Sequence, residues 1–159
     1  MIIPLTKDLW LIRYKMSMLG ADLRRNVTII RLNSGKLVIH STGPFTAGDI
    51  AAISGLGRPA WLVDSMLAHD TFAKEGRQAF PSIAYFAPPG FLPEIPTESL
   101  KTIPGEWGSE LRVLEISGMP SFQEYAFFHA FSRTLIVADL VFNFGPGESG
   151  LTKFLLKLA

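Results

Sequence analysis

The sequence contains several short apolar runs rich in β-branched residues, and this feature constrains the fold more than any other. Residues 27–32 and 36–40 are two such runs, and the Asn-Ser-Gly turn at 33–35 between them predicts a hairpin. A run at residues 10–14 predicts an earlier strand. Continuous apolar runs are typical of strands buried on both faces, which requires a layer of structure on each side of the sheet.

The middle of the sequence alternates predicted strands with predicted helices. Thr46 begins a helical pattern with Asp49 in its first turn, and a strand follows at residues 60–63. A second helical pattern at residues 71–80 leads to a strand at residues 83–86. Because parallel strands are usually joined by a crossover helix, this order predicts locally parallel pairing.

A proline-rich stretch at residues 88–105 separates the two halves of the sequence. A linker between two domains and a packed irregular segment both explain such a composition. The packed segment is favoured because the stretch also contains four large apolar residues, namely Phe91, Leu92, Ile95 and Leu100. At this length we expect residues 1–159 to form a single domain.

The second half of the sequence returns to strand patterns. Residues 111–116 alternate between apolar and polar types, which predicts a half-buried strand. Residues 125–131 and 134–142 flank a turn at 132–133 and predict a long hairpin, and residues 151–158 predict a short helix. Taken together, the elements predict an α/β (α+β) fold of two packed sheets with helices outside.

Composition and charge exclude several functions. The net charge of +1 provides no basic surface for nucleic acid, and we interpret the densest basic pair, Arg24-Arg25, as a solvated turn. The absence of cysteine excludes disulfides, zinc ribbons and thiol catalysis. The N-terminus does not resemble a signal peptide, and no run approaches the ~18 apolar residues of a membrane span. We therefore expect a cytoplasmic protein that binds neither nucleic acid nor a membrane.

The second hairpin carries a resemblance to a known fold. Residues 133–142 are similar to the strand of the metallo-β-lactamase fold that ends in a metal-bridging aspartate, here Asp139. From about residue 10 to the C-terminus, the sequence resembles the family called domain of unknown function 4336. The order and spacing of several short segments carry this resemblance, namely residues 36–41, 80–84, 87–90, 118–120, 124 and 127–129.

The resemblance implies an αββα sandwich of two mixed sheets and a set of zinc ligands, most of them from a His-x-His-x-Asp-His motif. Only the last histidine of that motif is kept, because the matching positions hold Asp64, Met66, Ala68 and His69. Asp139 is also kept, whereas His40 replaces an aspartate. A final histidine of the fold would come after Ala159, so we expect a chain that is truncated at its C-terminus.

Hydrolysis by this fold requires a metal ion that lowers the pKa of a bound water to about 7. Catalytic zinc normally has three protein ligands, so the retained pair of His69 and Asp139 is one ligand short. Asp64 is a candidate third ligand, and Asp70 and His40 are further candidates. Such a carboxylate-rich site suits Mn²⁺ or Mg²⁺ better than Zn²⁺. We expect no resident cofactor, with manganese, iron or zinc as the alternative.

Each of these residues also has a structural explanation. Asp70 directly precedes a helical pattern and is typical of a helix cap, while His69 can bind a loop carbonyl. Asp64 can orient the loop that follows it through the backbone amides of that loop. Asp139 lies in an apolar run, where a buried charge needs a partner, and His69 would satisfy it without a metal.

Three further polar residues have structural explanations as well. His40 and His129 lie on apolar strands, where a structural hydrogen bond is expected. Glu124 lies just before the hairpin strand, and we expect it to accept hydrogen bonds from backbone amides of the loop around Gly118.

Three functions remain open on the sequence alone. The preferred one is a degenerate, non-catalytic scaffold that binds a small molecule or a protein. The second is a metal-dependent hydrolase with a site made of Asp64, His69, Asp70 and Asp139. The third is a subunit of a homo-oligomer in which residues 151–158 pack on a second copy. The content of 48% apolar and 18% charged residues fits either covered strands or a surface reserved for a partner.

Overall fold

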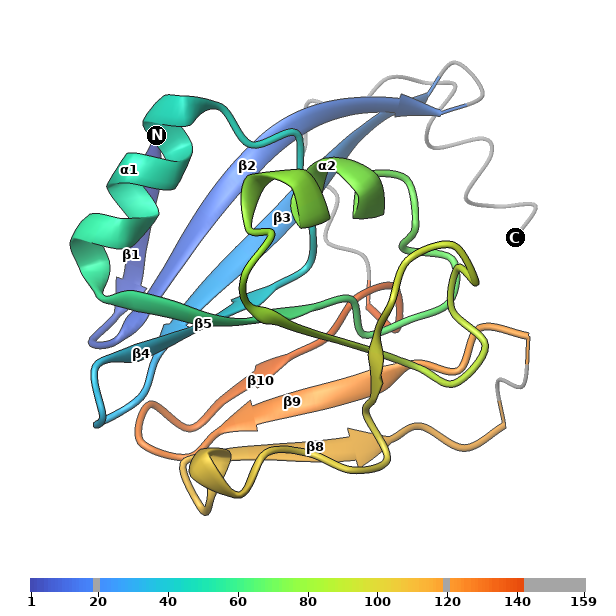
Figure 1. Cartoon of the computed structure of the whole chain (residues 1–159). Helices are drawn as coiled ribbons and strands as arrows, with labels where there is room; N and C mark the ends of the chain where they lie inside the picture. Colours follow the sequence, from blue (N-terminus) through green and yellow to red (C-terminus); the bar gives the residue numbers. More distant parts are fainter. Residues whose placement is uncertain (19–20, 119–120, 142–159) are drawn as a thin grey trace.

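Two β-sheets packed face to face form the framework of the molecule (Figure 1). This computed structural model describes residues 1–18, 21–118 and 121–141. The large sheet has its strands in sequence order, namely β1 (Ile2–Thr6), β2 (Leu9–Met18), β3 (Ala21–Arg31), β4 (Lys36–His40), β5 (Arg58–Val63), β6 (Ala84–Ala87) and β7 (Glu98–Ser99). The small sheet contains β8 (Leu111–Glu115), β9 (Tyr125–His129) and β10 (Thr134–Ile136).

The large sheet changes direction in its middle. Strands β1 to β4 pair antiparallel, whereas β4, β5, β6 and β7 pair parallel. Helix α1 (Ala47–Leu56) crosses from β4 to β5, and helix α2 (Ala73–Ala79) crosses from β5 to β6. The predicted parallel pairing around the strand–helix–strand unit is therefore confirmed.

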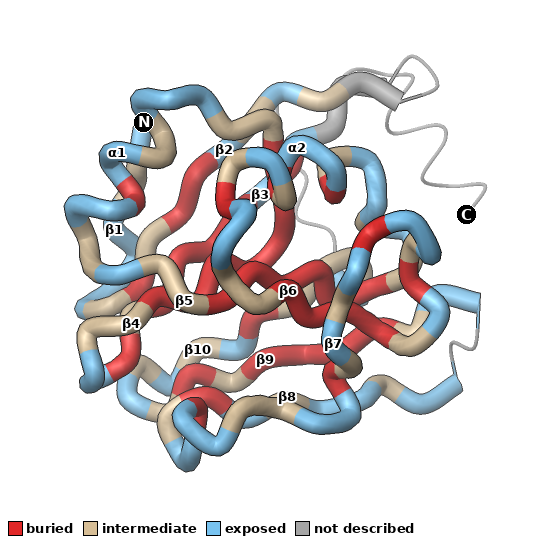
Figure 2. Tube along the Cα trace, in the orientation of Figure 1, coloured by how far each residue is buried: buried red, intermediate tan, exposed pale blue. Residues whose placement is uncertain are grey.

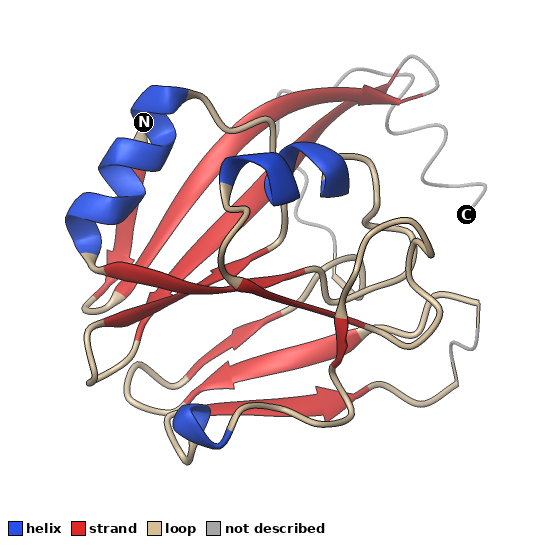
Figure 3. Ribbon diagram, viewed as in Figure 1, coloured by secondary structure: helices blue, strands red, loops and turns tan. Residues whose placement is uncertain are grey.

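Both α-helices lie on the face of the large sheet that points away from the small sheet (Figure 3). The predicted α/β architecture, with two packed sheets and helices outside, is confirmed. The three described strands of the small sheet pair only antiparallel, whereas we expected two mixed sheets. The reason is that the connections between these strands contain no crossover helix.

The core between the two sheets is aromatic. Trp61 and Phe86 from the large sheet meet the indole of Trp107, which in turn packs on Phe127 of the small sheet with ring centroids 5.8 Å apart. Trp107 belongs to the 3-10 helix η1 (Gly105–Trp107), which precedes β8. Figure 2 shows that β6 and β9 are buried along most of their length, whereas β8 at the edge of the small sheet is largely exposed or half-buried.

A second apolar layer lies between the large sheet and its helices. Ile39, Leu62 and Tyr85 point to this side of neighbouring strands and meet Ile53 of α1 and Phe80, which follows α2. Successive residues of β5 thus enter opposite layers, and this explains why the predicted strands are continuously apolar.

The proline-rich stretch is packed, as predicted. Phe91, Ile95 and Leu100 are buried, and Leu92 is partly buried. The stretch contributes the short edge strand β7 and ends at η1. The stretch is therefore a packed irregular segment in this structure.

Two predicted elements differ in the structure, and one strand was not predicted. The chain leaves β10 at Ile136, so Asp139 follows the strand instead of lying within it. The pair Arg24-Arg25 lies inside β3, not in a turn. Strand β1 was not predicted, because its mostly exposed residues lack a buried pattern. Residues 151–158 lie outside the described residues.

Local signals at two turns are confirmed. Thr46 caps α1 with a reciprocal pair of hydrogen bonds, in which its hydroxyl accepts from the Asp49 amide at 3.1 Å and its own amide donates to the Asp49 carboxylate at 3.0 Å. Gly35 adopts a φ of +75° in the hairpin turn.

Within the described residues, no helix is long and apolar enough to cross a bilayer.

The contact between α2 and the loop after β4 provides a first prediction. A Cβ atom added at Gly76 would lie 2.9 Å from Cβ of Thr42, a residue of the functional site. We expect Gly76→Ala to lower the free energy of unfolding by about 1–3 kcal/mol, because overpacking outweighs the better helix propensity. Gly55→Ala is the matched control. No atom lies within 4 Å of a Cβ added at Gly55, so we expect alanine to stabilise α1 through its better helix propensity. Urea unfolding measures both, and a stabilised Gly76→Ala would contradict the packing.

Candidate functional site

The predicted site residues gather where two parallel strands end. Strands β4 and β5 end side by side at His40 and Val63, and the Ser41 amide donates to the Val63 carbonyl at 2.7 Å. Asp64 follows β5 directly. The loops after the two strands therefore start next to each other at one edge of the large sheet, which is where open α/β sheets commonly bind ligands.

Asp64 is fully buried and held on both carboxylate oxygens. Its Oδ1 accepts from the Thr42 amide at 3.1 Å, and its Oδ2 accepts from the Thr42 hydroxyl at 2.8 Å and from the Tyr85 hydroxyl. We predicted that Asp64 orients its own following loop, and this is wrong, because the amide that it binds belongs to the loop after β4. Burial raises the pKa of Asp64, while Tyr85 and the charge of Arg25 oppose this rise.

Arg25 lies at the centre of the site although the sequence predicted a solvated turn. Within β3, Arg24 points to solvent and Arg25 points inward, with only 3% of its surface exposed. Its Nη1 donates to Ser41 Oγ at 3.2 Å, and its Nη2 donates to the His69 carbonyl at 3.2 Å. The guanidinium also lies over the ring of Phe72 at 5.7 Å.

Three carboxylates act on the charge of Arg25. Burial lowers the pKa of Arg25, and the negative charges of Asp64, Asp139 and Asp70 act against this shift. A buried cation is stable only when opposite charges compensate for the loss of water. The guanidinium makes no ion pair within 4 Å with a described carboxylate, so it acts on these three acidic residues through space.

His69 and Asp139 form the pair that the sequence suggested as one way to satisfy the Asp139 carboxylate. His69 Nε2 lies 3.3 Å from Asp139 Oδ1, and the two side chains are 14% and 37% exposed. Although burial raises the pKa of Asp139, the hydrogen bond and charge of His69 and the charge of Arg25 bring it below its ordinary value. Asp139 thus has a partner inside the protein.

Glu124 fixes the backbone that carries Asp139. Its carboxylate accepts from the Ala138 amide at 2.8 Å and from the Asp139 amide at 3.2 Å. We expected Glu124 to bind amides of the loop around Gly118, whereas the amides that it binds among the described residues are those of Ala138 and Asp139. The loop after β5 is tied to the same region, since the Tyr125 amide donates to the Ser65 carbonyl at 2.8 Å.

Asp70 and His40 differ from their predicted roles. Asp70 is exposed, and the N-cap of α2 is Phe72, with no side-chain hydrogen bond at that cap.

His40 is buried against Phe127 with ring centroids 4.8 Å apart, and its Nε2 has no hydrogen-bond partner among the described residues. Burial, His69 and Arg25 lower the pKa of His40 to about 3. For His129 the predicted structural hydrogen bond is confirmed, with Nδ1 2.7 Å from Ser132 Oγ.

Ser41 shows that the backbone of the site is strained. Its φ of +74° lies in the left-handed region, which a residue with a side chain rarely adopts. Such strain typically costs about 1–3 kcal/mol and is retained where the surroundings fix the conformation. Here the Ser41 amide and hydroxyl are both bound, the first to β5 and the second to Arg25.

The donor set does not fit a metal ion as it stands. Within residues 1–18, 21–118 and 121–141, no three or more His, Asp or Glu side chains are grouped so that they could hold an ion. Both oxygens of Asp64 already accept hydrogen bonds, and the guanidinium of Arg25 would repel a divalent cation. The assignment of Asp64, His69, Asp70 and Asp139 to a metal stays a prediction.

Three residues of the site were missed by the sequence reasoning, namely Arg25, Thr42 and Tyr85. Arg25 had a detectable signal. If the strand at residues 27–32 is extended backwards, Arg25 falls on the same face as Val27 and Ile29, which are buried. Thr42 and Tyr85 had no such signal, because they contact Asp64 across separations of 22 and 21 residues.

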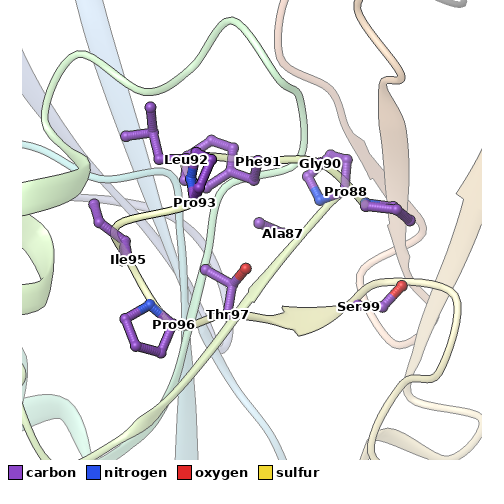
Figure 4. Close-up of a pocket in the computed structure, with 11 residues that line it drawn as sticks. Ala87, Pro88, Gly90, Phe91, Leu92, Pro93, Ile95, Pro96, Thr97 and Ser99 are labelled. Atoms are coloured by element: carbon purple, nitrogen blue, oxygen red, sulfur yellow. The ribbon is translucent and has the colours of Figure 1, made fainter.

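A hollow lies beside this cluster, at the end of β6 (Figure 4). It has a volume of about 310 Å³ and is lined by residues between Ala87 and Ser99. None of the eleven lining residues is charged. The hollow lies next to the cluster around Asp64, because Phe91, which lines the hollow, packs on Tyr85 with ring centroids 6.1 Å apart.

Several solved structures that resemble this chain are metallo-β-lactamases. The DIM-1 metallo-β-lactamase exposed to ceftazidime matches with a TM-score of 0.73 and 17% identity, over 96% of this chain and 75% of that one. The enzyme from Hirschia baltica matches with a TM-score of 0.64 and 13% identity, over 85% and 68%. FIM-1 from Pseudomonas aeruginosa, in its mono-zinc form, matches with a TM-score of 0.58 and 13% identity, over 80% and 63%.

At these identities the comparison shows the fold alone, so the chain has the metallo-β-lactamase fold that the sequence predicted. No family model and no curated protein matches the sequence. The resemblance to the family called domain of unknown function 4336 therefore stays a prediction.

The hydrogen bond from Tyr85 to Asp64 leads to a second prediction. Tyr85→Phe removes a donor from a buried carboxylate, so we expect the free energy of unfolding to fall by about 1–3 kcal/mol. Tyr125→Phe is the matched control, because Tyr125 is also buried and its hydroxyl has no hydrogen-bond partner within 3.5 Å among the described residues, with burial and the nearby Glu115 raising its pKa. Chemical unfolding compares the two variants. Equal losses would show that the Tyr85 hydroxyl does not hold Asp64.

Proposed function

We propose that this chain is a metal-independent, non-catalytic protein of metallo-β-lactamase fold that binds a small uncharged molecule. The observation that carries the proposal is the state of Asp64. This carboxylate matches a ligand position of the fold, yet its oxygens are bound by Thr42 and Tyr85, and a buried guanidinium provides its counter-charge. A hydrolase of this fold would need the same carboxylate for its ion.

The hollow beside the cluster supports a binding role. Its volume of about 310 Å³ is at the lower end of the range for small-molecule pockets. Proline rings, Phe91 and Ile95 provide apolar contacts, while Thr97 and Ser99 provide hydroxyl groups. Because no lining side chain is charged, a neutral ligand with one or two polar groups fits best.

The metal-dependent hydrolase is the second candidate. Two observations favour it: His69 and Asp139 lie side by side, and a protein of this fold, FIM-1, is known in a mono-zinc form. The pair still lacks a third ligand, because Asp64 is engaged elsewhere and Asp70 is exposed. Membership of the family called domain of unknown function 4336 and assembly through residues 151–158 are further proposals, which do not depend on this choice.

Metal content separates the first two candidates. Protein expressed with added manganese, iron and zinc should contain each metal at far less than one ion per chain, and it should not hydrolyse ceftazidime. The DIM-1 enzyme, expressed and purified in parallel, is the positive control for both measurements. A stoichiometric ion together with hydrolysis that a chelator abolishes would replace our proposal with the hydrolase.

The hollow can be tested by blocking it. Thr97→Trp places a large ring in the hollow, whereas the matched variant Thr102→Trp places one on an exposed residue outside it. In a thermal-shift screen of neutral, anionic and cationic fragments, we expect neutral fragments to stabilise the wild type and Thr102→Trp but not Thr97→Trp. Fragments that stabilise Thr97→Trp as much as the wild type would place the ligand elsewhere.

A further inference from the structure

We propose that the fold forms a cation site between its loops and that the guanidinium of Arg25 permanently occupies this site. The inference rests on the proposed function, because it explains how the residues that match metal ligands remain stable without a metal. The site is defined by the groups around the guanidinium, namely Ser41, Asp64, His69, Phe72 and Asp139, with Asp70 nearby.

The first support is that Arg25 connects three separate segments. It belongs to β3, binds the Ser41 hydroxyl in the loop after β4, and binds the His69 carbonyl in the loop after β5. It also lies over Phe72, just before α2. Oxygen atoms and an aromatic face are the groups that bind cations in proteins.

The second support is the balance of charge. The carboxylates of Asp64, Asp139 and Asp70 all act on Arg25, and Asp64 is fully buried. Without Arg25, the buried carboxylate of Asp64 would lose the positive charge that opposes the rise of its pKa, and an uncompensated buried charge is costly. The position therefore favours a cation over a neutral side chain of similar size.

The third support is that the hydrogen bonds of Arg25 do not explain its position alone. Its Nε is buried and has no partner among the described residues, and each of its two hydrogen bonds is 3.2 Å long. A neutral group could make bonds of this kind. The ring of Phe72, 5.7 Å from the guanidinium, favours a cation over such a group, because an aromatic face attracts positive charge.

The experiment removes the side chain of Arg25 and adds free guanidinium ions to the solution. Arg25→Ala should lower the melting temperature by roughly 10 °C, because the carboxylates lose the positive charge that acts on them. Guanidinium at low millimolar concentration, far below denaturing levels, should then raise the melting temperature of this variant in a saturable way. Manganese and magnesium are tested in the same way, with sodium at equal ionic strength as the control.

Arg24→Ala is the matched variant, because Arg24 is the exposed neighbour on the same strand. Neither Arg24→Ala nor the wild type should respond to low guanidinium. A folded Arg25→Ala protein that responds to none of the cations would overturn the cation site. The metal content of the wild type would be unchanged by that result, so failure here is distinct from failure of the proposed function.

A second pair of variants covers the case in which Arg25→Ala does not fold. Arg25→Lys keeps the charge, while Arg25→Gln keeps polar hydrogen bonding without it. We expect the melting temperature of Arg25→Lys to be clearly higher than that of Arg25→Gln. Equal melting temperatures would show that charge is not required at this position and would overturn the proposal.

Discussion

The buried carboxylate of Asp64 is the constraint on which the site depends. A fully desolvated carboxylate must find donors and positive charge inside the protein. Thr42 and Tyr85 supply the donors, and Arg25 supplies the charge. Each of these residues comes from a different strand or loop, so one charged group determines how three parts of the large sheet meet.

Most of the fold was predictable because it follows from local patterns. Apolar runs, the capping pair at Thr46 and the turn at Gly35 each encode their own structure over a few residues. The packed sheets and the parallel unit followed from the order of these elements. The main errors lay at strand ends, where β10 stops before Asp139 and β3 continues back beyond Arg25.

The site was predictable only in part. His69 and Asp139 were found through the resemblance, and their pairing without a metal was one of the outcomes foreseen. The environment of Asp64 was not predicted, because it depends on Tyr85 and Thr42, whose types carry no special signal in the sequence. Contacts between distant segments, such as the hydrogen bond from Arg25 to the His69 carbonyl across 44 residues, are determined by tertiary packing, which periodicity does not encode.

The large sheet is divided into an antiparallel part and a parallel part, and this division has a consequence for folding kinetics. Strands β1 to β4 are consecutive antiparallel neighbours, so they form through short-range loop closure. The contact between His69 and Asp139 spans 70 residues, and loop-closure entropy delays such contacts until distant segments have docked. Strands β1 to β4 can therefore pair early in folding, whereas the contact between His69 and Asp139 forms late, when the native state is complete.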